Sequence, residues 1–252
     1  MKPFLAPFLC SVLLAAPAAT AADDTAEAVV KKAIDAHGGA DALTKHKAGT
    51  YKVKGDLTVA GTDVSFTGDI AYELPSKFRM ALDAEVGGQK LALVQVVNGT
   101  KVKNSINGVS TKLGKAQTLE LIQAAAMQEI TVLEPLLDAK KYTIKPEKDE
   151  DVDGKPAAVV LVTGKNFKDT RLSFDKKSGL LVKTSRRAVA PDAPEDRQVV
   201  EDGFLSDYKK TDGVMLPGKM VVNHDGKKFM TMTVVEAALK DKADPKNFEV
   251  DD

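Results

Sequence analysis

The amino-acid sequence predicts a mainly β fold with helices (α+β), built on one large, strongly curled antiparallel sheet or open barrel. Apolar and polar residues alternate over 51–59, 64–74 and 78–86, and similar runs resume from 142 to about 238. This period of two is typical of strands with one buried and one solvated face. Turn pairs such as Asn107-Gly108 and Asp225-Gly226 separate the runs, and they favour hairpins because both residues tolerate positive φ. Roughly ten or more short strands of this kind favour a curled sheet or barrel.

Two stretches have helical spacing instead. Asp24 precedes Glu27 by three residues, as in a capping box, and apolar residues then recur every three or four positions until Gly38-Gly39. Residues 40–46 are expected to add a further turn. Helical spacing returns over 116–140, where Pro135 should kink the helix or start a second one. This helical insertion separates two blocks of strands, so it must pack on the sheet.

The first 21 residues have the features of a cleavable secretory signal peptide. Lys2 precedes an apolar run over 4–16, and Ala19-Thr20-Ala21 offers the small residues that a signal peptidase needs. We expect cleavage near Ala21 and a mature protein in the periplasm or secreted. Cys10, the one cysteine, lies inside the apolar run, so the mature chain has no thiol for a disulfide or a metal. No later run reaches about 18 apolar residues, so the mature chain has no predicted transmembrane segment.

Charge and composition exclude further classes of function. The chain has 36 basic and 36 acidic residues, and loss of Lys2 would leave the mature form one charge negative. Because both signs are interspersed, a nucleic-acid partner is not expected. The chain has no tryptophan and 5% aromatic residues, which disfavours a carbohydrate site built from aromatic platforms.

The sequence contains no recognisable catalytic, cofactor or metal motif. The three histidines, His37, His46 and His224, are expected at a helix end, in a connection and beside a turn. Aspartates at 149, 151 and 153 before Gly154 imitate the start of a calcium loop. The twelfth position is Val160, which cannot ligate a cation, so we interpret 149–154 as an acidic hairpin turn. We expect no catalytic residue, no cofactor and no metal.

Several short motifs match those of one known family. They are Gly68-Asp69-Ile70, the turn and strand from Pro75 to Met80, the hairpin 93–113 with Asn98-Gly99-Thr100-Lys101, Phe174-Asp175 with 178–181, and Asp207-Tyr208 with 212–217. Together with the order of elements, they resemble the periplasmic lipoprotein-carrier (LolA/LolB-like) superfamily, which includes proteins of outer-membrane lipoprotein sorting. The chain departs from the family carrier at Leu74, where the carrier has an arginine, and at Met80, where it has an aromatic residue.

The resemblance implies a specific architecture and function. Residues 22–252 would form a single incomplete, strongly curled antiparallel β-barrel, with the insertion at 116–140 as a helical lid over an apolar cavity. The implied function is binding or carriage of apolar ligands, namely lipid or lipoprotein acyl chains. Envelope proteins are further candidate partners, and we expect the mature chain to be a monomer.

Flexible and aromatic apolar residues are the candidates for lining such a cavity, because methionine adapts to ligands of varied shape. They are Phe66, Phe78, Met80, Leu82, Ile122, Leu133, Met220, Met230 and Met232. On periodicity alone the same residues could fill a core. A structural or interaction module with a filled core therefore stays open as an alternative, as does a hydrolase with an unrecognised site.

Overall fold

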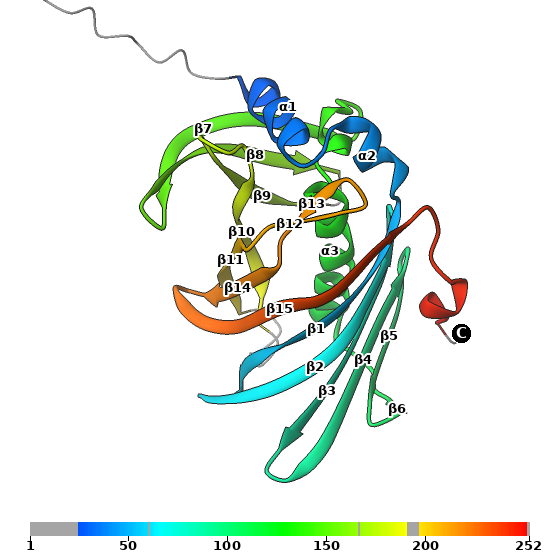
Figure 1. The fold of residues 1–252 in the computed structure, drawn as a ribbon. Coiled ribbons are helices and arrows are strands. Elements are labelled where there is room, and N and C mark those ends of the chain that lie inside the picture. The colour runs from blue at the N-terminus through cyan, green and yellow to red at the C-terminus, as the bar shows by residue number, and fades with distance from the viewer. Residues whose placement is uncertain (1–24, 60, 166, 191–196, 251–252) are drawn as a thin grey trace, which may run out of the picture.

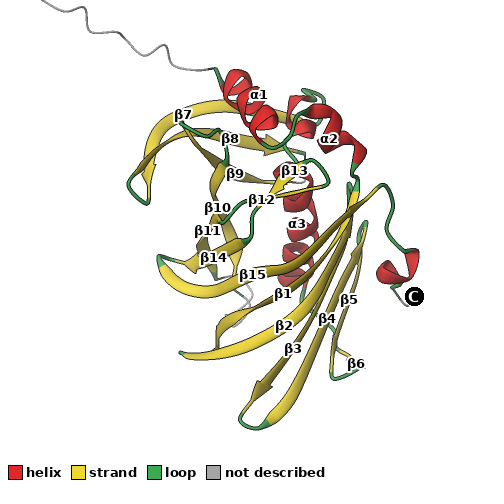
Figure 2. Ribbon diagram, in the orientation of Figure 1, coloured by secondary structure: helices red, strands yellow, loops and turns green. Residues whose placement is uncertain are grey.

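The computed structural model describes residues 25–250, apart from 60, 166 and 191–196. The predicted signal peptide with Cys10 and the predicted capping residue Asp24 lie outside the described residues. The rest is mainly β structure with few helices, as predicted (Figures 1 and 2).

In the described part of the chain, thirteen strands form one antiparallel sheet, in the order β6-β5-β4-β3-β2-β1-β15-β14-β11-β10-β9-β8-β7. The first arm consists of β1 (Ala48–Val59), β2 (Thr62–Glu73), β3 (Lys77–Val86), β4 (Gln89–Asn98), β5 (Lys101–Ile106) and β6 (Val109–Ser110). The second arm consists of β7 (Tyr142–Val152), β8 (Lys155–Gly164), β9 (Phe167–Asp175), β10 (Leu181–Val189), β11 (Gln198–Ser206), β14 (Lys219–His224) and β15 (Lys227–Lys240). A separate hairpin consists of β12 (Lys209–Thr211) and β13 (Val214–Leu216).

The two arms meet where β1 pairs with β15 along most of its length. Figure 1 shows the sheet curling from this seam so that the arms face each other. The edge strands β6 and β7 do not meet, so the sheet is an open half-barrel rather than a closed barrel. The predicted curled sheet is confirmed.

Hairpin turns lie where the sequence predicts them. Positive φ values occur at both residues of four predicted turns: Asn107-Gly108 (51° and 78°), Asp153-Gly154 (51° and 78°), Asp212-Gly213 (50° and 92°) and Asp225-Gly226 (48° and 76°). The turn at 149–154 is the predicted acidic hairpin: the Gly154 amide donates to the Asp151 carboxylate at 2.7 Å, and Asp149 forms an ion pair with Lys176.

The helices are α1 (Ala26–Ala36), α2 (Ala40–Lys45) and α3 (Lys115–Thr131), with short 3-10 helices η1 (Glu134–Leu137) and η2 (Pro245–Phe248). The predicted capping box is wrong, because Thr25 is the N-cap of α1 and its hydroxyl accepts from the Ala28 amide at 3.2 Å. The insertion is α3 plus η1, and Pro135 stands in the first turn of η1. Pro135 therefore starts a second helix, one of the two outcomes expected.

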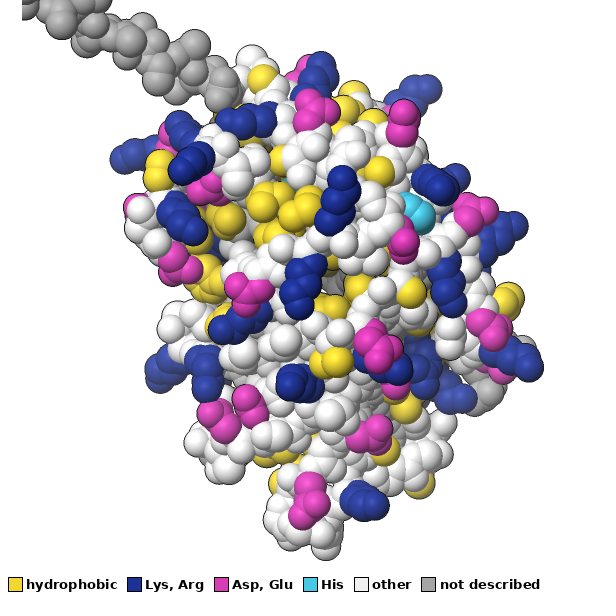
Figure 3. All heavy atoms as spheres, viewed as in Figure 1, with side chains coloured by type: hydrophobic (Ala, Val, Ile, Leu, Met, Phe, Trp, Pro, Cys, Tyr) yellow, Lys and Arg dark blue, Asp and Glu magenta, His cyan; other side chains and the backbone are white. Residues whose placement is uncertain are grey.

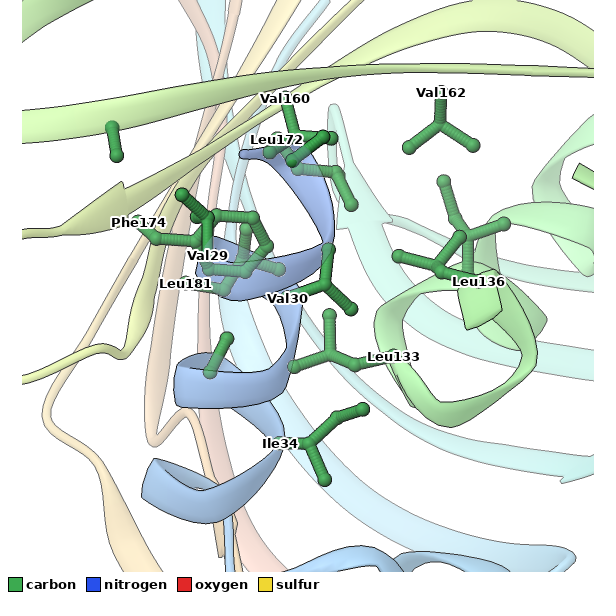
Figure 4. Packing of buried hydrophobic residues seen from close by; sticks show 14 of the residues in the cluster. Val29, Val30, Ile34, Leu133, Leu136, Val160, Val162, Leu172, Phe174 and Leu181 are labelled. Carbon is green, nitrogen blue, oxygen red and sulfur yellow. The ribbon is translucent and has the colours of Figure 1, made fainter. Parts of the chain in front are cut away.

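The main core lies between α1 and the strands β7, β8 and β9 (Figure 4). Val30 and Ile34 of α1 meet Leu133 and Leu136 from the end of the insertion, and Leu172 covers them from β9. A smaller cluster lies on the opposite face of the sheet, where Phe248 of η2 packs over Ala48, Ala71 and Val96. The C-terminal segment thus covers the outer face of the first arm.

Candidate ligand-binding face

The sheet has an inner face, defined here as the face that α1 and α3 cover. Helix α3 packs against β3, β4 and β5 of the first arm and against β9 and β10 of the second, and Figure 1 shows it between the two arms. Its Met127 lies 3.8 Å from the hydroxyl of Thr170 on β9. Thr170 stands opposite Arg186 of β10, which stands opposite Glu201 of β11. Following this register from strand to strand identifies the inner side chains of the whole sheet.

Six of the nine candidate residues come together on this inner face. They form one cluster around buried Val53 and Ile70, and they are Phe66, Phe78, Met80, Leu82, Met230 and Met232. Met220 stands opposite Met232 across β14 and β15, so it lies on the same face. Phe66 is buried at 5% exposure, whereas the other six are only partly buried. The structure therefore brings together an apolar, methionine-rich surface that is not sealed from solvent.

Glycines let the large side chains of this surface lie flat on the sheet. Gly55 stands opposite Phe66, and a Cβ at Gly55 would lie 2.9 Å from the Phe66 ring and 1.9 Å from the Thr231 carbonyl oxygen. Gly68 stands opposite Leu82, and a Cβ there would lie 2.6 Å from a Leu82 methyl. Because a ring or methyl occupies the place of a missing side chain, these residues extend across the sheet rather than upright from it.

The two candidates from the insertion have different surroundings. Ile122 lies on α3 and is partly buried. Leu133 is fully buried in the core with α1 and adopts a positive φ of 71°. The structure does not bring Leu133 together with the methionines, because the chain turns there from α3 into η1.

A charged network that the sequence analysis missed fixes α3 to the second arm. Glu120 of α3 accepts from Arg186 at 2.5 Å and from Lys168 at 2.8 Å. Its second oxygen also accepts from the Val189 backbone amide at 2.9 Å. Arg186 also pairs with Glu201 at 2.7 Å, and His224 lies 3.2 Å from Glu201. The sequence offers one signal for this network, because Arg186 and Arg187 are adjacent on a strand and one of them must point inward.

Burial and charge oppose each other in this network. Burial would lower the pKa of Arg186, but the charges of Glu201 and Glu120 raise it above its usual value. Burial would likewise raise the pKa of Glu201, but hydrogen bonding to His224 and the charge of Arg186 lower it. Both groups are thus held in their charged forms, as buried ion pairs require.

The other two histidines have structural surroundings. His37 caps the end of α1 and is buried at 5% exposure, with Nδ1 2.7 Å from the Ala33 carbonyl oxygen. His46 follows α2, and its ring lies 3.2 Å from the Asp212 carbonyl oxygen. Within the described ranges, no group of three or more His, Cys, Asp or Glu side chains is arranged to hold a metal ion. No helix of the described chain has the length and apolar character to cross a membrane.

A hollow lies on the outer face, away from the candidate residues. It has a volume of about 350 Å³, and its lining includes the small residues Thr50, Ala71 and Ala238. Arg79 and Asn247 also line it, the latter from η2. The mixed polar lining differs from the apolar inner face, and sequence reasoning gave no signal for it.

Comparison with solved structures finds the same fold in proteins of low sequence identity, among them the following three. A LolA superfamily protein from Nitrosomonas europaea aligns with a TM-score of 0.57 and 12% identity, covering 90% of this chain and 98% of the other. An outer membrane lipoprotein-sorting protein domain from Vibrio parahaemolyticus gives 0.55 and 11%, covering 88% and 97%. A DUF1329 family protein from Desulfovibrio piger gives 0.54 and 15%, covering 90% and 98%.

Sequence comparisons add no closer relative. No protein-family model matches the chain, and no curated protein matches it. The structural likeness extends over nearly the whole length of each protein, so the chain has a LolA/LolB-like fold. The resemblance predicted from the short motifs is confirmed at the level of the fold.

Proposed function

We propose that this protein binds and carries apolar ligands, lipid or the acyl chains of lipoproteins, on the inner face of its half-barrel. The observation that carries the proposal is the cluster of partly exposed methionine, phenylalanine and leucine side chains there. An exposed apolar surface of this kind is unfavourable in water unless something covers it. Methionine suits the role because its unbranched side chain adapts to ligands of varied shape.

The compartment and partners follow from the same proposal. Residues 1–21 support export and cleavage, which would release the carrier to the periplasm or medium as a monomer. Two of the proteins with this fold are a LolA superfamily protein and a lipoprotein-sorting domain, which favours lipoprotein-related ligands and envelope partners. The protein would act by binding alone, without a catalytic centre.

The competing function is a structural or interaction module with a filled interior. The observation that favours it is α3 itself, which lies between the two arms and packs against both. If α3 stays there permanently, the methionines are the side chains of a core. The two functions differ in what a charge at Met232 does.

The test is Met232→Glu, measured by melting temperature and by binding of a fluorescent fatty-acid analogue. On an open face the introduced carboxylate can hydrate, so the protein should stay folded. Its probe affinity should fall at least tenfold, because the ligand would bury that charge. In a filled core the same change should destabilise the protein severely. The matched control is Val235→Glu, which changes a valine of the same strand that is 56% exposed.

The results separate the two functions. Probe binding by the wild type, lost in folded Met232→Glu and kept in Val235→Glu, supports carriage. A wild type that binds no apolar probe, together with a Met232→Glu variant that unfolds, would contradict it. Mass spectrometry of lipids that co-purify with the exported protein would then identify the ligand class.

A further inference from the structure

Residues 86–119 carry an unusual distribution of charge. This segment contains five lysines, Lys90, Lys101, Lys103, Lys112 and Lys115, and neither Asp nor Glu. The rest of 22–252 carries 30 basic and 36 acidic side chains, because Lys2 and these five lysines are subtracted from the 36 of the whole chain. A chain of zero net charge is therefore polarised, with a basic segment over β4, β5, β6 and the start of α3.

The same segment exposes most of the large apolar side chains on the described surface. Eight such side chains are exposed, and five of them belong to 86–119: Val86 (44%), Leu91 (36%), Ile106 (39%), Val109 (67%) and Leu119 (50%). The other three, Leu137, Val200 and Val235, belong to three separate elements or connections. We name the segment 86–119 the basic rim.

Strand register connects the basic rim to the candidate ligand-binding face. Leu93 of β4 stands opposite Leu82 on one side and Ile106 on the other, and Ile106 stands opposite Val109 of β6. Leu91 precedes Leu93 by two residues and shares its face. The exposed apolar side chains of β4, β5 and β6 therefore continue the inner face outward to the edge of the sheet. Figure 1 shows these strands forming one free edge of the half-barrel.

We infer that the basic rim docks on a lipid bilayer that contains anionic headgroups. The apolar side chains lie on the inner face of this edge, Lys90, Lys101 and Lys103 alternate with them on its outer face, and Lys112 and Lys115 follow β6. Apolar side chains and lysines along one edge are the combination that binds such surfaces, because apolar groups enter the interface while lysines are attracted to its negative potential. A protein partner is less well matched, since the apolar side chains form a strip along a sheet edge and the charge is of one sign. The inference rests on the proposed function, since the rim would place the inner face where acyl chains leave or enter the bilayer.

The test is sedimentation of the exported protein with vesicles, either of neutral phosphatidylcholine or with one third phosphatidylglycerol. We expect strong preference for the anionic vesicles, and loss of that binding in 0.5 M salt because salt screens exposed charges. Lys112→Glu with Lys115→Glu should lower the partition coefficient at least tenfold, since each lysine near an anionic surface contributes about a fivefold effect. Lys145→Glu with Lys148→Glu, two exposed lysines of β7, is the matched control and should bind like wild type.

The apolar contribution is tested without changing charge. Ile106→Ser with Val109→Ser should weaken binding to anionic vesicles several-fold, while Val200→Ser with Val235→Ser should not. Equal partition on neutral and anionic vesicles, or equal effects of the rim and control pairs, would overturn the inference.

A separate measurement keeps this inference apart from the proposed function. Fatty-acid probe binding in solution, without vesicles, should be unchanged in Lys112→Glu with Lys115→Glu, because neither lysine belongs to the methionine cluster on the inner face. A wild type that binds the probe but ignores anionic vesicles refutes docking and leaves carriage intact. A wild type that binds vesicles through the rim but no probe refutes carriage and leaves docking intact.

Discussion

At the scale of single residues, alternation along strands predicts which side chains lie on the inner face but not the conformation that each side chain adopts there. Phe66, Leu82 and Met232 fall on one face by simple counting, and the structure brings them together. That Phe66 lies flat over Gly55 depends on which residue stands opposite in the next strand, and no local pattern contains that information. Side chains that lie flat leave more room above the sheet than upright ones, which favours a ligand site.

His37 illustrates how burial at one residue couples stability to pH. Burial lowers its pKa below the usual 6.5, an effect only partly offset by the hydrogen bond to the Ala33 carbonyl. As pH falls below 6.5, His37 binds a proton in the unfolded chain but stays neutral in the folded chain until the pH reaches its lowered pKa. The contribution of neutral His37 to the free energy of unfolding is therefore complete above pH 6.5. It is lost as pH falls through 6.5 toward the lowered pKa of the folded state.

We therefore predict a free energy of unfolding that decreases as pH falls below 6.5, with a smaller decrease in His37→Gln. Urea unfolding between pH 8 and pH 5 measures this, with His46→Gln as the control for loss of one histidine. An identical acid dependence in wild type and His37→Gln would contradict the assignment.

At the scale of elements, helical insertion and hairpins are predictable because their signals are local. The spacing of 116–140 and the Asp-Gly or Asn-Gly turns each lie within a few residues. The position of α3 on the sheet is not predictable in this way. It depends on Glu120 reaching Arg186, a partner 66 residues away, and on Lys168 from a different strand.

This anchoring makes a prediction for Glu120→Gln. Loss of the carboxylate leaves Arg186, whose side chain is 8% exposed, with Glu201 as its remaining ionic partner. The free energy of unfolding should fall by about 1–3 kcal/mol. Amide hydrogen exchange should accelerate more in α3 than in β8. Urea unfolding and exchange mass spectrometry measure both effects.

The control for Glu120→Gln is the exposed pair of Lys52 and Glu236, with side chains 62% and 63% exposed. Glu236→Gln should leave stability nearly unchanged, because water solvates and screens that pair. Equal effects of Glu120→Gln and Glu236→Gln would mean that the buried network does not hold α3 in place.

At the scale of the whole molecule, the seam between β1 and β15 determines the shape. It joins the first strand to the last, with Ala48 opposite Lys240, so the two arms become parts of one sheet. Composition and periodicity predict many strands and a curled sheet, but they do not say which strands are neighbours across such a distance. Figure 3 agrees with the neutral composition, since both signs of charge are interspersed over the face in view.

A continuous seam has a consequence for unfolding. Strand β1 of the first arm pairs with β15 of the second. If residues 22–252 form a single domain, unfolding of one arm removes the strand that pairs with the other arm, so neither arm unfolds alone. A tryptophan in either arm should then report the same transition as the whole sheet, because a single domain unfolds in one cooperative step. The chain has no tryptophan, so one introduced residue gives an unambiguous local signal.

We predict coincident transitions in two variants, Phe78→Trp in β3 of the first arm and Phe167→Trp in β9 of the second. Both phenylalanines are partly buried, so a larger ring should be tolerated at modest cost. In each variant, urea unfolding followed by tryptophan fluorescence should overlay the transition followed by far-UV circular dichroism. A fluorescence transition displaced from the dichroism transition in either variant would mean that the arms unfold separately, as two domains joined at the seam.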